Sequence, residues 1–176
     1  MFMVAAIAVA AIMSTTARAL SARSSSSSTV KTAMEEIVRT YFQGVHEKDA
    51  AKIRSCFAET AIIRDVCGLN SHERTVPAQA LVDRCMEFVA AHPDVEISFY
   101  YGPECGRNSD WVVAHWYETG TWSGDSCGVP APNPSVPMAV EGQTRFQVDP
   151  ISLKIQEFVV TRTFTEWEVK MLEMRS

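Results

Sequence analysis

The sequence predicts an α+β fold in which a curved antiparallel sheet wraps around N-terminal helices, forming a cone-shaped α+β barrel. In the first half of the chain, apolar residues recur at helical spacing over residues 33–48 and again after Pro77. In the second half, apolar and polar residues alternate, which is typical of strands with one buried face. No helical pattern separates these later strands, so we expect antiparallel pairing with the helices on one face.

Most of the predicted helices lie in the first half of the chain. Thr32 and Glu35 have the spacing of a capping box, which would start the first helix. That helix carries a broad apolar stripe, which should pack on the sheet. Asp49 is a residue type that caps helices through its side chain. We expect helices over residues 33–48, just after Asp49, from Pro77 to His92, and as a short helix or tail over residues 166–174.

The first predicted strand contains an acidic residue. The stretch AIIRDV, residues 61–66, is β-prone except for Asp65, because Asp is a poor strand former. Residues 70–75 are polar and residues 123–137 are rich in Gly and Pro, so both are expected to be loops. The predicted strands cover residues 61–66, 95–101, 111–122, 140–148 and 151–164.

Charge and cysteine spacing exclude two classes of protein. The net charge of the 176 residues is −5, so a nucleic-acid-binding surface is not expected. None of the five cysteines forms a C-x-x-C pair, and His46, His72 and His92 have no ligand spacing. We therefore expect no metal and no cofactor. An odd number of cysteines cannot pair completely within one chain, and we favour reduced, mostly buried thiols.

The first 31 residues read as a leader that is cleaved or disordered, which leaves a single domain over residues 32–176. Residues 2–13 are apolar and have the length of a signal-peptide core, and Ala17-Arg18-Ala19 matches a small-x-small cleavage site. The Ser-rich, acid-free segment that follows has the composition of a transit peptide. This two-part leader resembles those of proteins sent to plastids of secondary red-algal origin. Secretion is the alternative destination.

Four stretches carry a resemblance to a known superfamily. They are YFQGVHEKD from Tyr41, AIIRDVCG from residue 61, DWVVAHWYETGTWSG from Asp110, and the strand from Gly142 to Val148 with the residues after it. In this order and spacing they resemble the SnoaL-like and nuclear-transport-factor-2-like proteins, which include ketosteroid isomerases and polyketide cyclases. The resemblance spans nearly all of the mature chain and implies a cone with a dead-end pocket.

The resemblance to the ketosteroid isomerases implies two catalytic residues. Asp65 falls on their general base, and Tyr41 falls on their oxyanion-hole tyrosine, without a gap between them. Abstraction of a proton beside a carbonyl needs such a carboxylate and such a hydrogen-bond donor. Structural alternatives stay open for both residues. Asp65 could cap a turn before Gly68, and Tyr41 could be a core residue with a satisfied hydroxyl.

The sequence departs from the catalytic patterns of these families at three positions. Gly142 stands where the isomerases have a second, protonated acid as oxyanion donor. Trp122 and Thr163 stand where the SnoaL-type cyclases have a histidine and an aspartate. Neither catalytic set is complete, so the resemblance supports a pocket more directly than it supports a reaction.

The long strand over residues 111–122 supplies further candidates. Its alternation places Trp116, Glu118 and Trp122 on the inward face and His115 on the outer face. A buried Glu118 would be a second acid–base candidate with a raised pKa, although we favour a bulge or strand-end position that reaches solvent. The ligand-binding residues are predicted to be Trp116, Glu118, Trp122, Gly142 and Phe146.

Two hypotheses of function follow. The first is a cofactor-free isomerase, cyclase or dehydratase that acts on an apolar ketone-like substrate, with Asp65 as base and Tyr41 as oxyanion donor. The alternative is a non-catalytic module that binds a ligand or assembles into an organellar complex. The expected partners are a small apolar ligand and a second copy of the chain bound through the sheet. No nucleic acid, and no membrane for the mature form, is expected.

Overall fold

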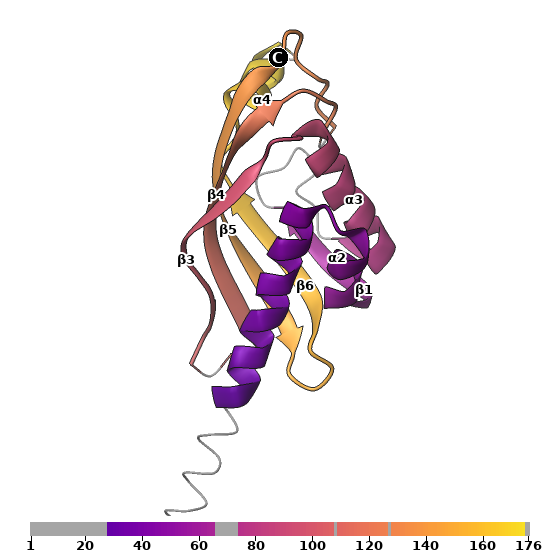
Figure 1. Cartoon of the computed structure of the whole chain (residues 1–176), viewed down its shortest axis with the longest axis vertical. Coiled ribbons are helices and arrows are strands. Elements are labelled where there is room, and N and C mark those ends of the chain that lie inside the picture. Colours follow the sequence, from indigo (N-terminus) through magenta and orange to yellow (C-terminus); the bar gives the residue numbers. More distant parts are fainter. Residues whose placement is uncertain (1–27, 66–73, 108, 127, 175–176) are drawn as a thin grey trace, which may run out of the picture.

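The N-terminal helix lies along one face of a curved sheet (Figure 1). The computed structural model describes residues 28–65, 74–107, 109–126 and 128–174. The first helix covers residues 28–47, so it begins four residues before Thr32, whose hydroxyl donates to the Ser28 carbonyl instead of capping the helix. The expected capping box is therefore wrong. The rest of the predicted leader lies outside the described residues.

The other helices follow the expected order. Asp49 caps α2 as predicted, because its carboxylate accepts a hydrogen bond from the Lys52 backbone N–H at 2.9 Å. The last helix is capped by Thr165 through a capping box with Glu168. These helices are α2 (Ala50–Cys56), α3 (Ala78–Ala91) and α4 (Glu166–Glu173).

The six strands form one sheet in the order β2-β1-β6-β5-β4-β3. Each neighbouring pair is antiparallel except β1 and β6, which are parallel. The α+β class is confirmed, while the purely antiparallel sheet is corrected to a mixed one. The strands are β1 (Phe57–Asp65), β2 (Arg74–Pro77), β3 (Glu96–Cys105), β4 (Trp111–Trp122), β5 (Val136–Asp149) and β6 (Lys154–Arg162).

Several boundaries differ from those predicted. Arg74 and Thr75, expected in a loop, belong to β2 because they pair with β1. β5 begins at Val136 and extends into the segment expected to be a loop, because Val136 and Pro137 continue the ladder with β4. These differences reflect pairing between distant strands, which a local pattern does not contain.

An aromatic cluster fastens the N-terminal helix to the sheet. The Tyr41 ring makes edge-to-face contacts with Phe146 on β5 and Phe158 on β6, with centroids 5.5 and 5.8 Å apart. Phe146 is fully buried, and aromatic pairs of this geometry add about 0.5–1.5 kcal/mol beyond burial. The core therefore lies between this helix and the concave face of the sheet. No helix among the described residues is long and apolar enough to cross a membrane.

Candidate active-site pocket

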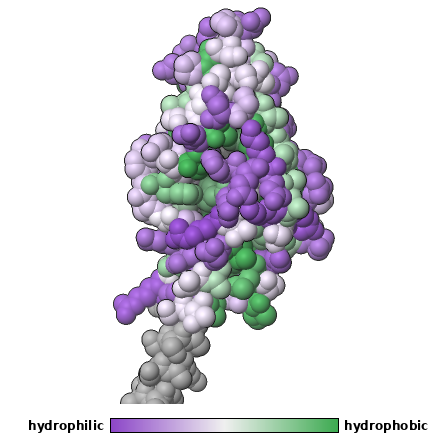
Figure 2. All heavy atoms as spheres, viewed as in Figure 1, coloured by the Kyte–Doolittle hydropathy of each residue, from purple (hydrophilic) through white to green (hydrophobic). Residues whose placement is uncertain are grey.

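A cavity of about 130 Å³ lies between the concave face of the sheet and the helices. That volume is roughly ten times what one water molecule needs, so it suits a small organic molecule. Figure 2 shows hydrophobic residues gathered in a hollow that hydrophilic residues border. The walls of the cavity are mainly apolar and include Phe42, Phe57, Phe88, Trp116, Trp122 and Phe158.

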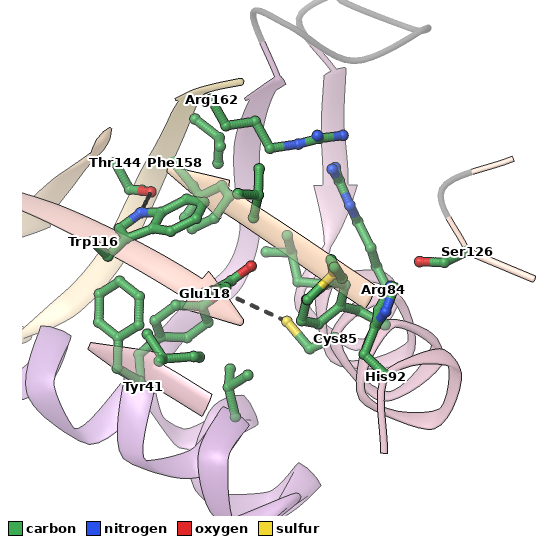
Figure 3. A pocket seen from close by; sticks show the side chains of 18 of the residues that line it. Tyr41, Arg84, Cys85, His92, Trp116, Glu118, Ser126, Thr144, Phe158 and Arg162 are labelled. Carbon is green, nitrogen blue, oxygen red and sulfur yellow. Dashed lines mark hydrogen bonds between the residues drawn. The ribbon is translucent and has the colours of Figure 1, made fainter. Parts of the chain in front are cut away.

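Glu118 projects from β4 into this apolar cavity (Figure 3). The strand runs without a bulge against β5, where Glu118 is opposite Val140, so the predicted alternation holds along β4. The expected bulge is therefore wrong, and Glu118 is half-buried on a regular part of the strand. Burial raises its pKa to about 7, and the positive charge of Arg162 only partly opposes this rise. At neutral pH the carboxyl group can both accept and donate a proton.

Tyr41 brings a hydroxyl group from the N-terminal helix to the same cavity. The hydroxyl oxygen lies 3.7 Å from Cys85 Sγ on α3. Burial, followed by the neighbouring Cys85, raises the Tyr41 pKa well above its ordinary value, and the Glu118 charge acts in the same direction. The phenol is therefore protonated at neutral pH and able to donate a hydrogen bond to a ligand oxygen.

His92 closes one wall of the cavity as a neutral imidazole. The ring is buried against Phe88 and Trp122, with centroid distances of 4.6 and 4.8 Å. Burial lowers its pKa, although a hydrogen bond with the Thr121 backbone opposes the shift. Its Nδ1 atom has no hydrogen-bond partner among the described residues. His92 thus serves the pocket as a rigid aromatic wall.

A buried ion pair lies at the end of the cavity next to α4. Arg162 Nη2 donates to Glu168 Oε1 at 2.7 Å, and Nη1 donates to Oε2 at 3.0 Å. Glu168 also accepts hydrogen bonds from the Thr165 backbone and hydroxyl. Burial alone would raise the Glu168 pKa, but these hydrogen bonds and the Arg162 charge hold it below its ordinary value. Glu168 is therefore an ionised carboxylate, unlike Glu118.

The role of Asp65 as the general base stays a prediction. Asp65 is the last residue of β1, and its backbone is paired with Val160, which lines the cavity. The side chain of Asp65 lies outside the described residues. Of the two predicted catalytic residues, Tyr41 lines the cavity, together with Glu118.

Gly142 and Phe146 are not among the residues that line the cavity. The Trp116 indole lies over Gly142: a Cβ atom at residue 142 would be 2.5 Å from Trp116 Cζ2. Trp116 is held there because its Nε1 donates to Thr144 Oγ1 at 2.8 Å. An acidic donor at residue 142, as in the isomerases, would collide with this ring. Trp116, Glu118 and Trp122 do line the cavity.

Sequence reasoning missed several polar groups of the cavity. Arg162 ends a strand and Glu168 lies on the next helix, so no single periodicity links the two residues. Arg84 and Cys85 on α3 also line the cavity. Helical spacing can show which residues face inward, but it does not show that a cavity lies there. No group of three or more metal-binding side chains occurs within the described ranges.

Residues 29–97 match the family described as "Putative lumazine-binding". Among solved structures, a protein of Shewanella denitrificans OS-217 assigned as a SnoaL-like polyketide cyclase superposes with a TM-score of 0.62 at 13% identity, covering 80% of this chain and 97% of that one. A similarly assigned protein of Jannaschia sp. CCS1 gives 0.60 at 19%, covering 81% and 91%. The chain has the SnoaL-like, nuclear-transport-factor-2-like fold.

A third solved structure shares this fold. SalBIII, an epoxide hydrolase/cyclase-like enzyme in pyran ring formation in the polyether salinomycin, gives a TM-score of 0.56 at 21% identity, covering 74% of this chain and 91% of that one. No curated protein matches the chain in sequence. These similarities show the fold, and the cavity on its concave face has room for a small molecule.

Proposed function

We propose that this protein is a cofactor-free acid–base enzyme that acts on a small apolar carbonyl compound. One observation carries the proposal: a carboxyl group with a pKa of about 7, Glu118, faces an aromatic-walled cavity that also holds the Tyr41 hydroxyl. A pKa close to the working pH is what a general base requires. Carboxyl groups shifted in this way by burial concentrate at functional sites.

The proposed reaction begins with transfer of a proton from carbon to Glu118. The Glu118 carboxylate takes a proton from the carbon next to the substrate carbonyl, and the electron pair of that C–H bond moves toward the carbonyl oxygen. Tyr41 donates a hydrogen bond to this oxygen as negative charge develops on it. The protonated Glu118 then returns the proton, either to another carbon in an isomerisation or to a leaving hydroxyl in a dehydration. No electrons leave the substrate, so no redox cofactor is required.

The apolar walls support the substrate class. Trp116, Trp122 and Phe158 offer flat surfaces to a ring or an unsaturated chain, and apolar pockets with few polar groups select such ligands. The similarity to SalBIII and to the polyketide cyclase-like structures supports a ring-forming or ring-modifying reaction.

Exchange of carbon-bound hydrogen tests this proposal. With 2-tetralone as probe in D₂O, the protein is expected to accelerate deuterium incorporation beside the carbonyl, measured by mass spectrometry. Glu118→Gln is expected to reduce the rate by about 10²–10⁴-fold, which is the usual contribution of a general base. Glu96→Gln is the matched control, because Glu96 is exposed on the adjacent strand β3. Full activity in Glu118→Gln would contradict the proposal.

Asp65→Asn separates the two candidate bases in the same assay. Loss of exchange in Asp65→Asn with retained exchange in Glu118→Gln would identify Asp65 as the general base, as the sequence resemblance implies. We expect the opposite pattern, because the Glu118 carboxyl group faces the cavity next to Tyr41.

The second candidate function is ligand binding without turnover. It is favoured by Trp116, whose indole takes the space where the isomerases hold their second oxyanion donor. The apolar fluorescent probe N-phenyl-1-naphthylamine is expected to bind under either function. Saturable binding of this probe, combined with no exchange in any of several cyclic ketones, would favour the binding module.

We propose that the outer face of the sheet forms a homodimer. Tyr100, Tyr101 and Tyr117 are 59, 44 and 37% exposed, and the Tyr100 ring contacts Tyr117. Light scattering is expected to give twice the chain mass, and Tyr100→Asp is expected to weaken the dimer by at least tenfold. Ile151→Asp is the control, since Ile151 is 92% exposed in the turn between β5 and β6. A monodisperse monomer would contradict this surface.

A further inference from the structure

One buried nitrogen atom in the cavity wall has no part in the proposed reaction. His92 is 1% exposed, and its Nδ1 atom has no hydrogen-bond partner among the described residues. Buried polar side-chain atoms nearly always have a partner, and each exception needs an explanation. Because His92 also lines the cavity, a molecule bound there can supply the missing partner.

The contacts of the His92 imidazole decide the chemistry of that partner. The ring has a hydrogen bond with the Thr121 backbone that raises its pKa, as donation from the ring to a carbonyl oxygen does. Since Nδ1 makes no bond, the donor in this contact is Nε2–H. Burial keeps the ring neutral, so Nδ1 holds a lone pair and accepts a hydrogen bond. The missing partner is therefore an O–H or N–H donor.

The imidazole is held in place, so its Nδ1 atom cannot easily turn to another partner. Phe88 and Trp122 both pack against the ring. Thr165 lines the same cavity, but its hydroxyl group donates to Glu168 Oε2 at 3.0 Å. An acceptor that is buried and fixed in this way favours ligands that carry a donor at the matching position.

A ligand that contacts both Tyr41 and His92 must be about as long as two fused rings. Cys85, whose Sγ lies 3.7 Å from the Tyr41 hydroxyl oxygen, is seven residues before His92, which caps the end of α3. Seven residues are about two helical turns, so the two residues share one side of α3 and are roughly 10 Å apart. Figure 3 shows His92 across the cavity from Tyr41.

We propose that the substrate is a hydroxy ketone whose hydroxyl group, at the end opposite the carbonyl, donates a hydrogen bond to His92 Nδ1. The inference rests on the proposed function for the carbonyl, which Tyr41 binds. His92 then determines specificity and takes no part in the proton transfer.

Calorimetric titration with three ketones tests this inference. 6-Hydroxy-2-tetralone, with its hydroxyl at the far end of the fused rings, is expected to bind about tenfold tighter than 2-tetralone, because a buried acceptor gains its partner. 6-Methoxy-2-tetralone has no O–H group and should gain nothing. His92→Phe keeps an aromatic wall without the acceptor, so it should bind 2-tetralone and its 6-hydroxy derivative equally. His46→Phe is the matched control, since His46 is exposed on the N-terminal helix, and it should keep the preference.

Three results would overturn the inference: equal binding of 2-tetralone and its 6-hydroxy derivative to the wild type, an unchanged preference in His92→Phe, or a methoxy derivative that binds as tightly as the hydroxy one. The titrations are done in H₂O, where proton exchange leaves each ketone unchanged. They therefore measure binding alone, and their failure is distinct from a failure of the exchange assay.

NMR of the wild-type protein gives a reading that does not depend on the folding of His92→Phe. With ¹⁵N in the histidine rings, the His92 signals are assigned by replacing the other three histidines one at a time. 6-Hydroxy-2-tetralone is expected to move the Nδ1 signal much farther than 2-tetralone does, while Nε2 stays protonated with both. An Nδ1 signal that responds equally to the two ketones would also overturn the inference.

Discussion

Replacing Glu118 with glutamine is expected to stabilise the folded protein by about 3 kcal/mol at pH 8. The Glu118 pKa is about 7 in the folded protein, against an ordinary value of 4.5. Each pKa unit corresponds to about 1.36 kcal/mol, so ionising this carboxyl group inside the pocket opposes folding by about 3 kcal/mol. Glutamine fills the same space and never ionises.

The pH dependence gives the sign of this effect. Below about pH 4.5 both the folded and the unfolded states keep the Glu118 proton, so Glu118 costs no stability there. Between pH 4.5 and 7 the unfolded state releases the proton while the folded state retains it, and stability falls as the pH rises. Above pH 7 the cost is complete. The difference between the two proteins should therefore grow mainly between pH 5 and pH 7.

Urea unfolding at pH 5 and pH 8 measures this difference in the free energy of unfolding. The exposed variant Glu96→Gln should change little between the two pH values. Curves of stability against pH that run parallel for the wild type and Glu118→Gln would contradict the buried, protonated state. A Glu118→Gln protein that is more stable but inactive would show that the reactive carboxyl group lowers the stability of the folded protein.

Gly142→Ala is expected to destabilise the protein by about 1–3 kcal/mol, because a methyl group there collides with the Trp116 ring. The new Cβ would be 2.5 Å from Cζ2 and 2.6 Å from Cη2 of that indole. The ring cannot easily move away, because its Nε1 donates a hydrogen bond to Thr144 Oγ1. Overpacking of this kind forces either the side chain or the strand to shift.

A double-mutant cycle with Trp116→Phe measures the collision itself. Phenylalanine lacks the two ring atoms in conflict, so Gly142→Ala should cost at least about 1 kcal/mol less in the Trp116→Phe background. Trp116→Phe alone will also destabilise the protein, because Thr144 loses its buried partner. Strictly additive free energies of unfolding in the cycle would show that the indole does not exclude a side chain at residue 142.

The periodicity of the sequence predicted the helices and strands that build the pocket. The alternation of β4 correctly directed Trp116, Glu118 and Trp122 inward, because a strand period depends only on neighbouring residues. It did not predict that Glu118 would line an apolar cavity, since other walls of that cavity come from the N-terminal helix and α3. Burial of one side chain is a property of the assembled layers.

The sequence also did not predict which distant segments pair with each other. The parallel pairing of β1 with β6 depends on where the helices place β1 on the sheet, and no local pattern records that placement. The pair of Arg162 and Glu168 likewise depends on how α4 folds back after β6. Thr32 has a residue type that often caps a helix, but here the helix begins before it. The Thr32 hydroxyl donates a hydrogen bond to the Ser28 carbonyl within the helix.

The parallel pairing of β1 with β6 also has a kinetic consequence. β1 can join β2 early, but its other edge stays open until β3, β4 and β5 have been added and β6 arrives. Forming contacts between segments so distant along the chain costs conformational entropy before the favourable contact energy is gained. Such topologies therefore fold slowly. The open edge of β1 is then the segment most exposed to wrong pairing with other chains. A chaperone that shields this edge would be expected to raise the yield of folded protein.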